Sequence, residues 1–157
     1  MDAGGERAHP RGDRRLHFVM RAAGTLHRGL FRLTGGRFGG SLGAMPVLLL
    51  TTTGRKSGQP RTWPLGYFRD DDRIIVTASA GGQAGHPAWY LNLRANPRVT
   101  VQLGRDTRAM LAEAATGDER ERLWMKLVGD FPNFADYQRR TARQIPVVIL
   151  TPLAADE

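Results

Sequence analysis

Residues 47–80, VLLLTTTGRKSGQPRTWPLGYFRDDDRIIVTASA, decide the fold that we expect for this chain. Runs rich in valine, isoleucine, threonine and aromatic residues alternate there with turn residues, as they do in antiparallel sheets. The pattern predicts strands at 47–53, 62–68 and 73–80, and the RDDD segment predicts a tight turn between the last two. Because Pro64 has no amide hydrogen to donate to a neighbouring strand, we expect the second strand to lie at an edge or to be irregular near its start.

The rest of the chain adds strands and helices to this pattern. Strands are expected at 98–103 and 107–115, and the apolar IPVVILT segment is expected to form a last, fully buried strand. Pro87 suits the first turn of a short helix over AWYLNLRAN, and FPNFADYQRRT is expected as a second short helix or an ordered loop. Six short strands with helices at both ends and one in the middle predict a small barrel or an α+β sheet rather than a doubly wound parallel fold.

The helix that follows residue 115 carries the clearest start signal of the chain. Thr116 and Glu119 have the spacing of a capping box, in which each of the two side chains bonds to the other residue's backbone amide. The apolar residues of this helix begin at Leu123. We therefore expect Thr116 to cap the helix.

Composition limits the classes of protein to which the chain can belong. With 157 residues, 41% of them hydrophobic, the chain has the size of one domain with a real core. It contains no cysteine, which excludes disulfides, thiolate metal sites and cysteine nucleophiles and agrees with a reducing cytoplasm. No apolar run approaches the ~20 residues that span a bilayer, and no export signal is evident, so we expect a cytoplasmic protein.

The net charge of +8 is concentrated toward the N-terminus. Residues 1–40 hold eight arginines against three acidic residues; we expect 1–13 to be a disordered basic tail and 14–34 to be an amphipathic helix of the single domain 14–157. An ordinary packed helix and a basic helix lying on an anionic membrane both fit this segment. The arginine excess also fits a GC-rich genome, so a functional patch and a solvated face both stay open.

The GRKSG segment between the first two strands predicts either a polar hairpin tip or a site for an anion. Gly54 and Gly58 allow the backbone to approach a ligand closely, and the amides of such a turn can converge on an anion. The loop combines these glycines with three cations and three hydroxyls, namely Arg55, Lys56, Arg61, Thr52, Thr53 and Ser57. A Walker A loop is excluded, because Arg55 and Leu50 stand where that motif requires glycine.

Catalytic clusters are not evident elsewhere in the sequence. The four histidines are isolated from one another and from carboxylates at ligand spacing, so we expect no metal site. The G-x-S-x-G elbow of many serine hydrolases is missing as well. An anion site, aromatic residues and the lack of an acid–base cluster together favour a protein whose chemistry belongs to a bound cofactor.

Several of these segments occur together in one known family. The combination of LLLTTTGRKSGQPR, VTASAGG, HPAWYLNLRANPRVTVQ and IPVVILTP resembles the deazaflavin-dependent nitroreductase family, the actinobacterial reductases that use coenzyme F420. The resemblance runs from about residue 45 to residue 152, roughly two thirds of the chain. It implies an α+β fold built on a split β-barrel of about six mostly antiparallel strands, which agrees with the strands expected from the residues.

The resemblance also implies roles for individual residues. The anionic tail of the coenzyme is expected on the hairpin loop, its ring along the third strand and the middle helix, and the acceptor beside the FPNFADYQ segment. The implied tail contacts are Thr52, Arg55, Lys56, Ser57, Gly58, Gln59, Pro60 and Arg61. The implied ring contacts are Val76, Ala78, Ser79, Gly81, Trp89 and Tyr90, and the implied acceptor contacts are Phe131, Phe134 and Tyr137. Tyr137 is the candidate proton donor, and simple packing is the alternative for Trp89 and Tyr137.

Two departures from the family pattern shape the expected activity. Ala80 stands where many relatives have a cation, which implies weaker binding of the tail or a different preferred tail length. The FPNFADYQ segment has one tyrosine where nitro-reducing relatives have several. We expect hydride transfer from the reduced coenzyme to an electron-poor acceptor such as a quinone, an activated alkene or a nitro compound, with nitro reduction inefficient.

Two alternatives stay open on the sequence alone. One is a split barrel that uses FMN with a nicotinamide donor, since FMN also carries a phosphate. The other is a non-catalytic basic module on a membrane or on nucleic acid, and nucleic acid is the less expected of these two partners. For the reductase we expect a small-molecule acceptor, a monomer or a homodimer, and, as an option, peripheral association of the basic helix with the inner face of the membrane.

Overall fold

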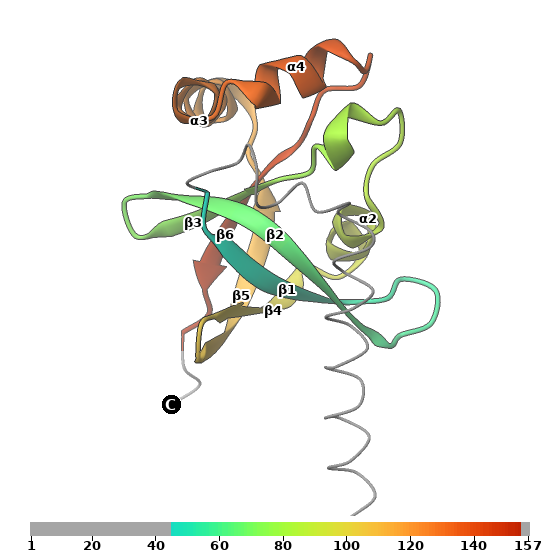
Figure 1. The fold of residues 1–157 in the computed structure, drawn as a ribbon. Helices are drawn as coiled ribbons and strands as arrows, with labels where there is room; N and C mark the ends of the chain where they lie inside the picture. Colours follow the sequence, from blue (N-terminus) through green and yellow to red (C-terminus); the bar gives the residue numbers. More distant parts are fainter. Residues whose placement is uncertain (1–44, 155–157) are drawn as a thin grey trace, which may run out of the picture. The chain divides into compact units, whose positions relative to one another are not determined.

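The computed structural model describes residues 45–154, which form a six-stranded antiparallel barrel with helices packed around it (Figure 1). The strands are β1 (Val47–Thr53), β2 (Pro60–Asp70), β3 (Arg73–Thr77), β4 (Arg98–Leu103), β5 (Asp106–Ala114) and β6 (Val147–Pro152). They close in the order β1-β2-β3-β6-β5-β4, because β4 pairs with β1. The predicted α+β barrel of six strands is therefore confirmed, whereas the predicted tail at 1–13 and helix at 14–34 lie outside the described residues.

The alternation of side chains along β1 explains how this strand builds the barrel. Leu48, Leu50 and Thr52 are buried and point to the interior, as every second residue of a half-buried strand does. Their partners in the antiparallel register are Leu65, Trp63 and Arg61 of β2, respectively. Because directly paired residues share one face of a sheet, Arg61 and Trp63 lie on the inner face of β2, at the end of β2 nearer the loop.

Strand β2 is divided between two neighbours. Its residues 60–66 pair with β1, whereas residues 67–70 pair with β3. Pro64 stands opposite Leu49 in the first of these halves, ahead of the pairing with β3, so the missing amide hydrogen falls at a local edge as predicted. The strand runs from Pro60 to Asp70 and is longer at both ends than the predicted 62–68.

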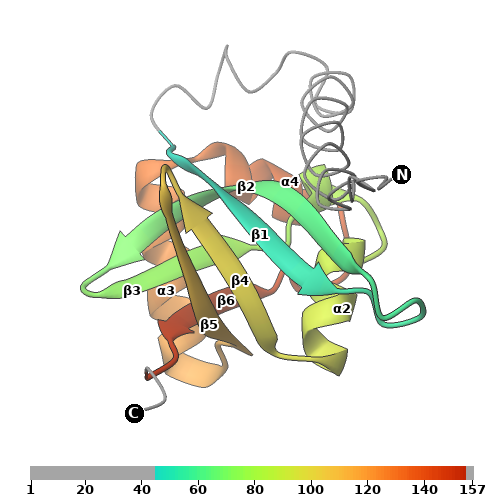
Figure 2. The ribbon, with the colours of Figure 1, turned by 90° about the horizontal axis from the view of Figure 1, so that it is seen from below.

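Three α-helices and a short 3-10 turn complete the described part of the chain. They are η2 (Ala80–Gly82), α2 (Ala88–Ala95), α3 (Gly117–Asp130) and α4 (Asn133–Arg139). Helix α2 packs Trp89, Tyr90 and Leu93 into the same core cluster as Leu48 and Leu50 of the barrel. Helices α3 and α4 lie next to each other, and α4 also contacts η2, as Figures 1 and 2 show.

Three sequence-based expectations need correction. Thr116 occupies the N-cap position of α3, but its side chain makes no capping hydrogen bond, and Glu119 instead pairs with Arg73 of β3. The third strand ends at Thr77 rather than at residue 80, because the chain turns into η2. The last strand begins at Val147, two residues later than predicted, although Ile145 is fully buried as expected.

One further expectation is resolved by the helices. The FPNFADYQRRT segment contains α4, so the helical alternative is confirmed. Within residues 45–154 no helix has both the length and the apolar character needed to cross a bilayer.

Candidate functional site

The predicted site residues gather on the side of the barrel where α2 lies. The β1–β2 hairpin loop (residues 54–59) lies beside α2 in Figures 1 and 2. The loop that contains η2 (residues 78–86) leads into α2 and contacts α4. Residues that are widely separated in the sequence are therefore held together by direct contacts between these four segments.

The hairpin loop is a tight turn that requires its two glycines. The Gly54 amide donates to the Gln59 carbonyl at 2.8 Å, and the Gly58 amide donates to the Gly54 carbonyl at 2.8 Å. A Cβ on Gly54 would lie only 2.6 Å from Ser57 Oγ, and Gly58 has a φ of +68°. Larger residues at either position would therefore strain or displace the loop.

The amides of this loop contribute less to an anion site than the sequence suggested. The amides of Gly54, Arg55, Gly58 and Gln59 all donate within the protein, to Gln59 O, Asn92 Oδ1, Gly54 O and Ser57 Oγ. Those of Lys56 and Ser57 are left for a ligand among residues 54–59. An anion on this loop would accordingly meet side-chain cations rather than a nest of converging amides.

The cations of the loop carry charge that no acid of the described chain neutralises. Arg55, Lys56 and Arg61 are exposed, and no carboxylate within residues 45–154 lies at ion-pair distance from any of them. Arg61 projects from the inner face of β2, opposite Thr52. Three unpaired cations around one turn are a fitting donor set for a phosphate or a carboxylate.

Asn92 of α2 fixes the loop in place, and sequence reasoning missed this residue. Its side chain is 4% exposed, and its Oδ1 accepts from the Arg55 amide at 3.2 Å and from Arg55 Nη1 at 3.1 Å. Its Nδ2 donates to Thr52 Oγ1 at 3.1 Å. The arrangement joins α2 to the end of β1 and to the first part of the loop, and it orients the Arg55 guanidinium. A lone asparagine on a helix gives no local signal, because its partners are 37 and 40 residues away in the sequence.

A second segment of the site, residues 78–86, has an unusual backbone. Ala80, Gly81 and Gly82 all have positive φ angles, of 45°, 63° and 83°. The Arg143 guanidinium donates to three backbone carbonyls of this segment, those of Ala78, Ser79 and Gln83, at 2.9 to 3.1 Å. Sequence reasoning did not identify Arg143 either, because its partners are 60 to 65 residues away in the sequence.

His86 closes this segment as a neutral side chain. Burial, the Arg143 charge and the Arg94 charge lower the pKa of His86 below its ordinary value. The neutral ring can therefore accept a hydrogen bond at Nδ1, where Arg143 Nη1 lies at 3.2 Å. His86 and the three carbonyls together satisfy most of the Arg143 donors.

The predicted ring contacts divide into buried and accessible residues. Val76, Ala78, Trp89 and Tyr90 belong to the core cluster, and Trp89 is only 4% exposed. Core packing, the alternative weighed for Trp89, therefore describes its place in the structure. Ser79 is half-buried, and Gly81 is exposed at the tip of η2. Within the described residues, a planar ligand would meet this segment mainly through its backbone and through Ser79 and Gly81.

The predicted acceptor contacts lie beside the same segment. A Cβ on Gly82 would lie 2.6 Å from the carbonyl oxygen of Tyr137, so η2 and α4 are in close contact. The Tyr137 hydroxyl is 3.3 Å from Asn133 Nδ2, and the Tyr137 ring stacks edge-on against Phe134 with centroids 5.4 Å apart. Phe134 is buried, whereas Phe131 and Tyr137 are half-buried. The structure thus brings the predicted ring side and the predicted acceptor side together.

One buried polar atom on the inner face of β2 has no partner. The indole nitrogen of Trp63 is buried and makes no hydrogen bond to the described residues. Trp63 shares the inner face of β2 with Arg61, two residues earlier. An unsatisfied buried N–H costs stability, and the structure offers no explanation for this one.

A pocket of about 150 Å³ lies elsewhere in the described part of the molecule and contains none of the predicted residues. It is lined by residues of the β2–β3 turn, the β4–β5 hairpin and the barrel wall, namely Arg69, Asp72, Ile74, Val101, Leu103, Asp106, Arg108, Met110 and Pro152. In residues 45–154 there is also no cluster of three side chains suited to a metal ion. The hairpin loop therefore stays the candidate site.

Comparison with known proteins gives one consistent result. Residues 25–152 match the sequence model of a family described as F420H(2)-dependent quinone reductase. The chain is 43% identical over 130 residues to the F420H(2)-dependent quinone reductase Rv1261c of Mycobacterium tuberculosis, which covers 80% of this chain and 87% of that protein.

Solved structures agree with this result. One described as an F420-H2 dependent reductase (FDR-A) is 42% identical, with a TM-score of 0.61 over 67% of this chain and 93% of its own. Another, described as a domain-swapped dimer, is 38% identical, with a TM-score of 0.62 over 76% of this chain and 95% of its own.

Proposed function

The chain belongs to the F420H(2)-dependent quinone reductase family, and from this premise we propose that it is an oxidoreductase that uses reduced coenzyme F420 to reduce a quinone. The observation that carries the proposal is the hairpin loop with three exposed cations, Arg55, Lys56 and Arg61, that no acid within residues 45–154 pairs with. Three cations on one turn concentrate positive charge where the phosphate or carboxylate of a ligand can accept charge-assisted hydrogen bonds.

The residues of the loop fit the anionic part of the coenzyme. Arg55 and Arg61 present planar guanidinium groups and Lys56 a compact point charge, the two kinds of donor that phosphate and carboxylate groups accept from. Thr52, Ser57, Gly58, Gln59 and Pro60 shape the loop around these charges.

The ring is assigned to the neighbouring segment of the site. When it is bound, reduced F420 supplies the hydride. Residues 78–83, the first part of the loop that contains η2, are called the 78–83 loop below. Ser79 and Gly81 are its contacts that can meet the ring. Beneath them lies a rigid buried layer formed by Val76, Ala78, Trp89 and Tyr90. Because these four side chains are packed in the core, they act by fixing the position of the surface that receives the ring.

The acceptor is assigned to α4 and the residues before it. The half-buried Phe131 and the buried Phe134 beside it make this side apolar, which suits a quinone better than a charged acceptor. We assign to the Tyr137 hydroxyl the hydrogen bond or the proton to the acceptor oxygen. Its present neighbour, Asn133, is held on the same helix and keeps that hydroxyl oriented.

A substitution at Tyr137 tests this assignment. We expect Tyr137→Phe to lower turnover of a naphthoquinone by roughly 10²-fold or more, the usual contribution of a positioned acid, while the dissociation constant for F420 stays the same. Steady-state kinetics with F420H2 and fluorescence titration with F420 measure the two quantities. Wild-type turnover in the variant would remove Tyr137 from the mechanism and leave it a packed residue.

The experiment that tests the proposed function is a fluorescence titration of the full-length protein with F420, with FMN titrated in parallel. Saturable binding of F420 alone, followed by quinone-dependent oxidation of F420H2, is the expected result. Binding of FMN alone would keep the fold and replace the donor with a flavin. Binding of neither would leave the loop as a polar hairpin tip.

Two finer features are proposals that build on the same function. The basic residues 1–40 and the lipid solubility of many quinones support a protein that associates with an anionic membrane surface. Replacing Arg14, Arg15, Arg21, Arg28 and Arg32 by glutamine in the full-length protein should abolish its sedimentation with phosphatidylglycerol vesicles. The similar structure described as a domain-swapped dimer supports a homodimer, which light scattering would distinguish from a monomer.

A further inference from the structure

Arg143 connects the segment between α4 and β6 to the 78–86 loop through an arginine fork. Its Nη1 donates to the Ala78 carbonyl at 3.1 Å, its Nη2 to the Ser79 carbonyl at 2.9 Å, and its Nε to the Gln83 carbonyl at 3.0 Å. Nη1 also lies 3.2 Å from His86 Nδ1. A planar guanidinium with fixed donor directions suits this set of acceptors, and a lysine ammonium does not.

The loop that Arg143 binds does not adopt a relaxed conformation. Ala80 has a φ of +45° and is followed by two glycines that are also left-handed. Glycine tolerates this region, but the Cβ of alanine pays a steric cost there. Such backbone persists only where its surroundings over-determine it, and it is concentrated at functional sites.

The surroundings that hold this loop are Arg143 on one side and α4 on the other. Gly82 lies so close to α4 that a Cβ would meet the Tyr137 carbonyl oxygen at 2.6 Å and the Arg140 Cβ at 2.9 Å. The Ala78 amide donates to the Pro146 carbonyl at 2.9 Å, so the start of the loop is bonded through both its amide and its carbonyl.

The Arg143 segment is itself tied to the helix on the acceptor side. Gln138 of α4 donates through Nε2 to the Arg143 carbonyl at 2.8 Å and accepts at Oε1 from the Ile145 amide at 2.9 Å. No acid of residues 45–154 pairs with Arg143, so the hydrogen-bonding capacity of its guanidinium goes to the loop carbonyls. A continuous series of contacts therefore runs from α4 through Arg143 to the 78–83 loop.

We propose that Arg143 is a positioning residue for the reaction: its fork holds the 78–83 loop in the strained conformation that receives the deazaflavin ring, in fixed relation to α4. The inference rests on the proposed function, because it assigns the ring to this loop. Arg143 touches neither ring nor acceptor and acts through the backbone of Ala78 and Ser79. Its role is separate from that of the hairpin cations, which face the other end of the coenzyme.

The test compares Arg143→Gln and Arg143→Lys with the control Arg139→Gln, all in the full-length protein. Arg139 is an exposed residue of α4 whose partner is Asp136 on the same helix, so its replacement removes the same charge without touching the loop. Hydrogen exchange of the peptide covering 78–86 is measured on the coenzyme-free protein. Fluorescence titrations then use F420 and a deazaflavin fragment without the phosphate and glutamate tail, well below the melting temperature.

Both Arg143 variants are expected to exchange the 78–86 amides at least tenfold faster than the wild type and to bind F420 and the tail-less fragment about tenfold more weakly. The equal loss for both ligands locates the effect at the ring. Lys56→Ala should instead weaken the binding of F420 and leave the binding of the fragment unchanged. A merely structural role for Arg143 would lower the melting temperature while the folded variants bind both ligands as the wild type does.

Each other result has a distinct meaning. Wild-type binding of both ligands by Arg143→Lys overturns the proposal, because charge without the fork would then be sufficient; this milder variant also decides the matter if Arg143→Gln does not fold. Unchanged exchange of the 78–86 amides overturns it as well. A wild-type protein that binds neither F420 nor the fragment overturns the proposed function itself, a failure separate from loss of the Arg143 effect in a protein that binds both.

Discussion

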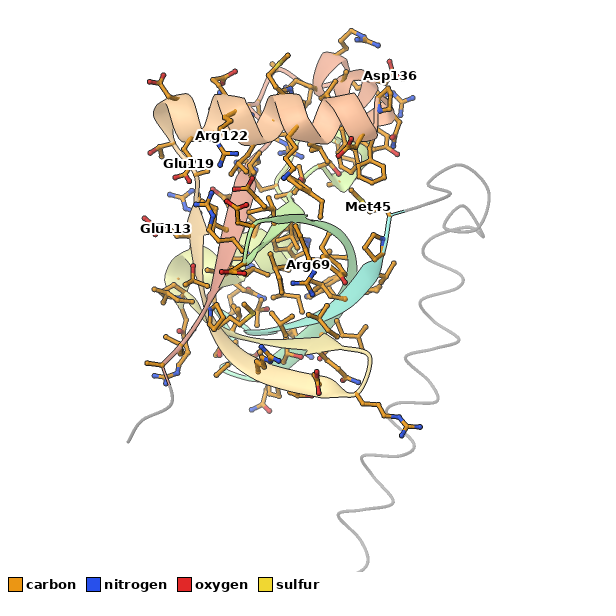
Figure 3. The ribbon with its side chains drawn as sticks, turned by 90° about the vertical axis from the view of Figure 1, so that its left-hand side faces the viewer. Met45, Arg69, Glu113, Glu119, Arg122 and Asp136 are labelled. Atoms are coloured by element: carbon orange, nitrogen blue, oxygen red, sulfur yellow. The ribbon has the colours of Figure 1, made fainter. Side chains whose placement is uncertain are left out.

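Two clusters of basic side chains in this molecule differ in what surrounds them. The first, the Asp70 cluster, consists of Asp70, Arg73, Glu119, Arg122 and Lys126. Asp70, at its centre, is 4% exposed. Its carboxylate accepts hydrogen bonds from Arg73 at 2.5 Å, from Arg122 at 2.8 and 2.9 Å, and from Lys126 at 3.2 Å. Figure 3 shows Glu119 and Arg122 on the side of α3 that faces the barrel. The cluster joins the β2–β3 turn to α3.

The second cluster is the hairpin loop with Arg55, Lys56 and Arg61. Its cations have no acidic partner within the described residues, and the group that orients Arg55 is the neutral amide of Asn92. An amide fixes a guanidinium without neutralising it, so the full charge stays available for a ligand. The two lysines of the chain make the same contrast, since Lys126 belongs to the first cluster and Lys56 to the second.

The comparison shows that a count of basic residues says little about where a protein binds anions. In the sequence, the first cluster appears as basic residues near an aspartate-rich turn, and the second appears as basic residues near a glycine-rich turn. The distinguishing feature is whether the fold supplies a carboxylate, as it does through Asp70 at the end of β2. In the first cluster, loss of the acid would leave buried charge uncompensated, whereas in the second the charges of the three cations stay available to an anionic ligand.

The largest effect is expected from removing the acid of the first cluster. Asp70→Asn leaves three cations together without their carboxylate and should lower the free energy of unfolding by about 2 to 3 kcal/mol. This value lies below the usual range for a fully buried pair, because the three partners are partly solvated and relieve their repulsion in water. Urea unfolding followed by circular dichroism measures the change.

The matched control for this variant is Asp106→Asn in the β4–β5 hairpin. Asp106 is exposed and meets a single arginine, Arg108, at 3.9 Å, so its loss should change the unfolding free energy by no more than about 0.5 kcal/mol. F420 affinity should be unchanged in both variants at temperatures where they are folded. A stability loss of equal size for the two variants would remove the distinction between the Asp70 cluster and an ordinary surface pair.

Local pattern was sufficient for most of the fold. The apolar and threonine-rich alternation of residues 47–53 predicted β1 with its bounds, and Pro64 correctly indicated an edge. The prediction failed where a long-range contact decided the local conformation. Glu119 had the spacing for a capping box, but Arg73 takes its carboxylate, and the strand expected up to residue 80 stops at Thr77 where the loop bound by Arg143 begins.

The site was predictable only in the part that one short segment encodes. The hairpin cations lie within one short segment of the sequence, so spacing alone raised the possibility of an anion site at Arg55 to Arg61. Asn92 and Arg143 were not predictable in this way, because each acts on residues 37 to 65 positions away. Trp89 was identified, but its role was ambiguous in the sequence, because an aromatic residue on a short helix fits both a ring contact and the core. Its burial places it in the core cluster.

A smaller effect is expected from the second cluster. Arg55→Ala should raise the dissociation constant for F420 at least tenfold, or about 1.4 kcal/mol, because it removes one cation and the tether to Asn92. The free energy of unfolding should change by less than that of Asp70→Asn. Fluorescence titration at two salt concentrations measures the affinity, which should also weaken with added salt in the wild type.

The control for this prediction is Arg105→Ala at the tip of the β4–β5 hairpin. Arg105 is exposed, and its removal takes one positive charge from a hairpin outside the candidate site. F420 affinity should then stay within twofold of the wild type. Equal weakening by Arg55→Ala and Arg105→Ala would mean that net charge, rather than the hairpin loop, governs binding.

Lowering the pH should remove the stability contributed by the Asp70 cluster and leave the hairpin cations unchanged. The hydrogen bonds from Arg122 and Arg73 hold the pKa of Asp70 far below its ordinary value, so on acidification the unfolded chain takes up the proton first. The stability that Asp70 contributes is therefore complete above about pH 5 and declines as the pH falls through the ordinary carboxyl range near 4. The decline should be less than the limit of about 1.4 kcal/mol per pH unit while the carboxyl of the unfolded chain is only partly protonated. Urea unfolding between pH 6 and pH 3 should show that the difference in unfolding free energy between wild type and Asp70→Asn is constant above about pH 5 and narrows below it. The difference between wild type and Arg55→Ala should stay constant, because arginine does not titrate there. A gap for Asp70→Asn that is the same at pH 3 as at pH 6 would mean that the Asp70 charge does not hold α3 to the β2–β3 turn.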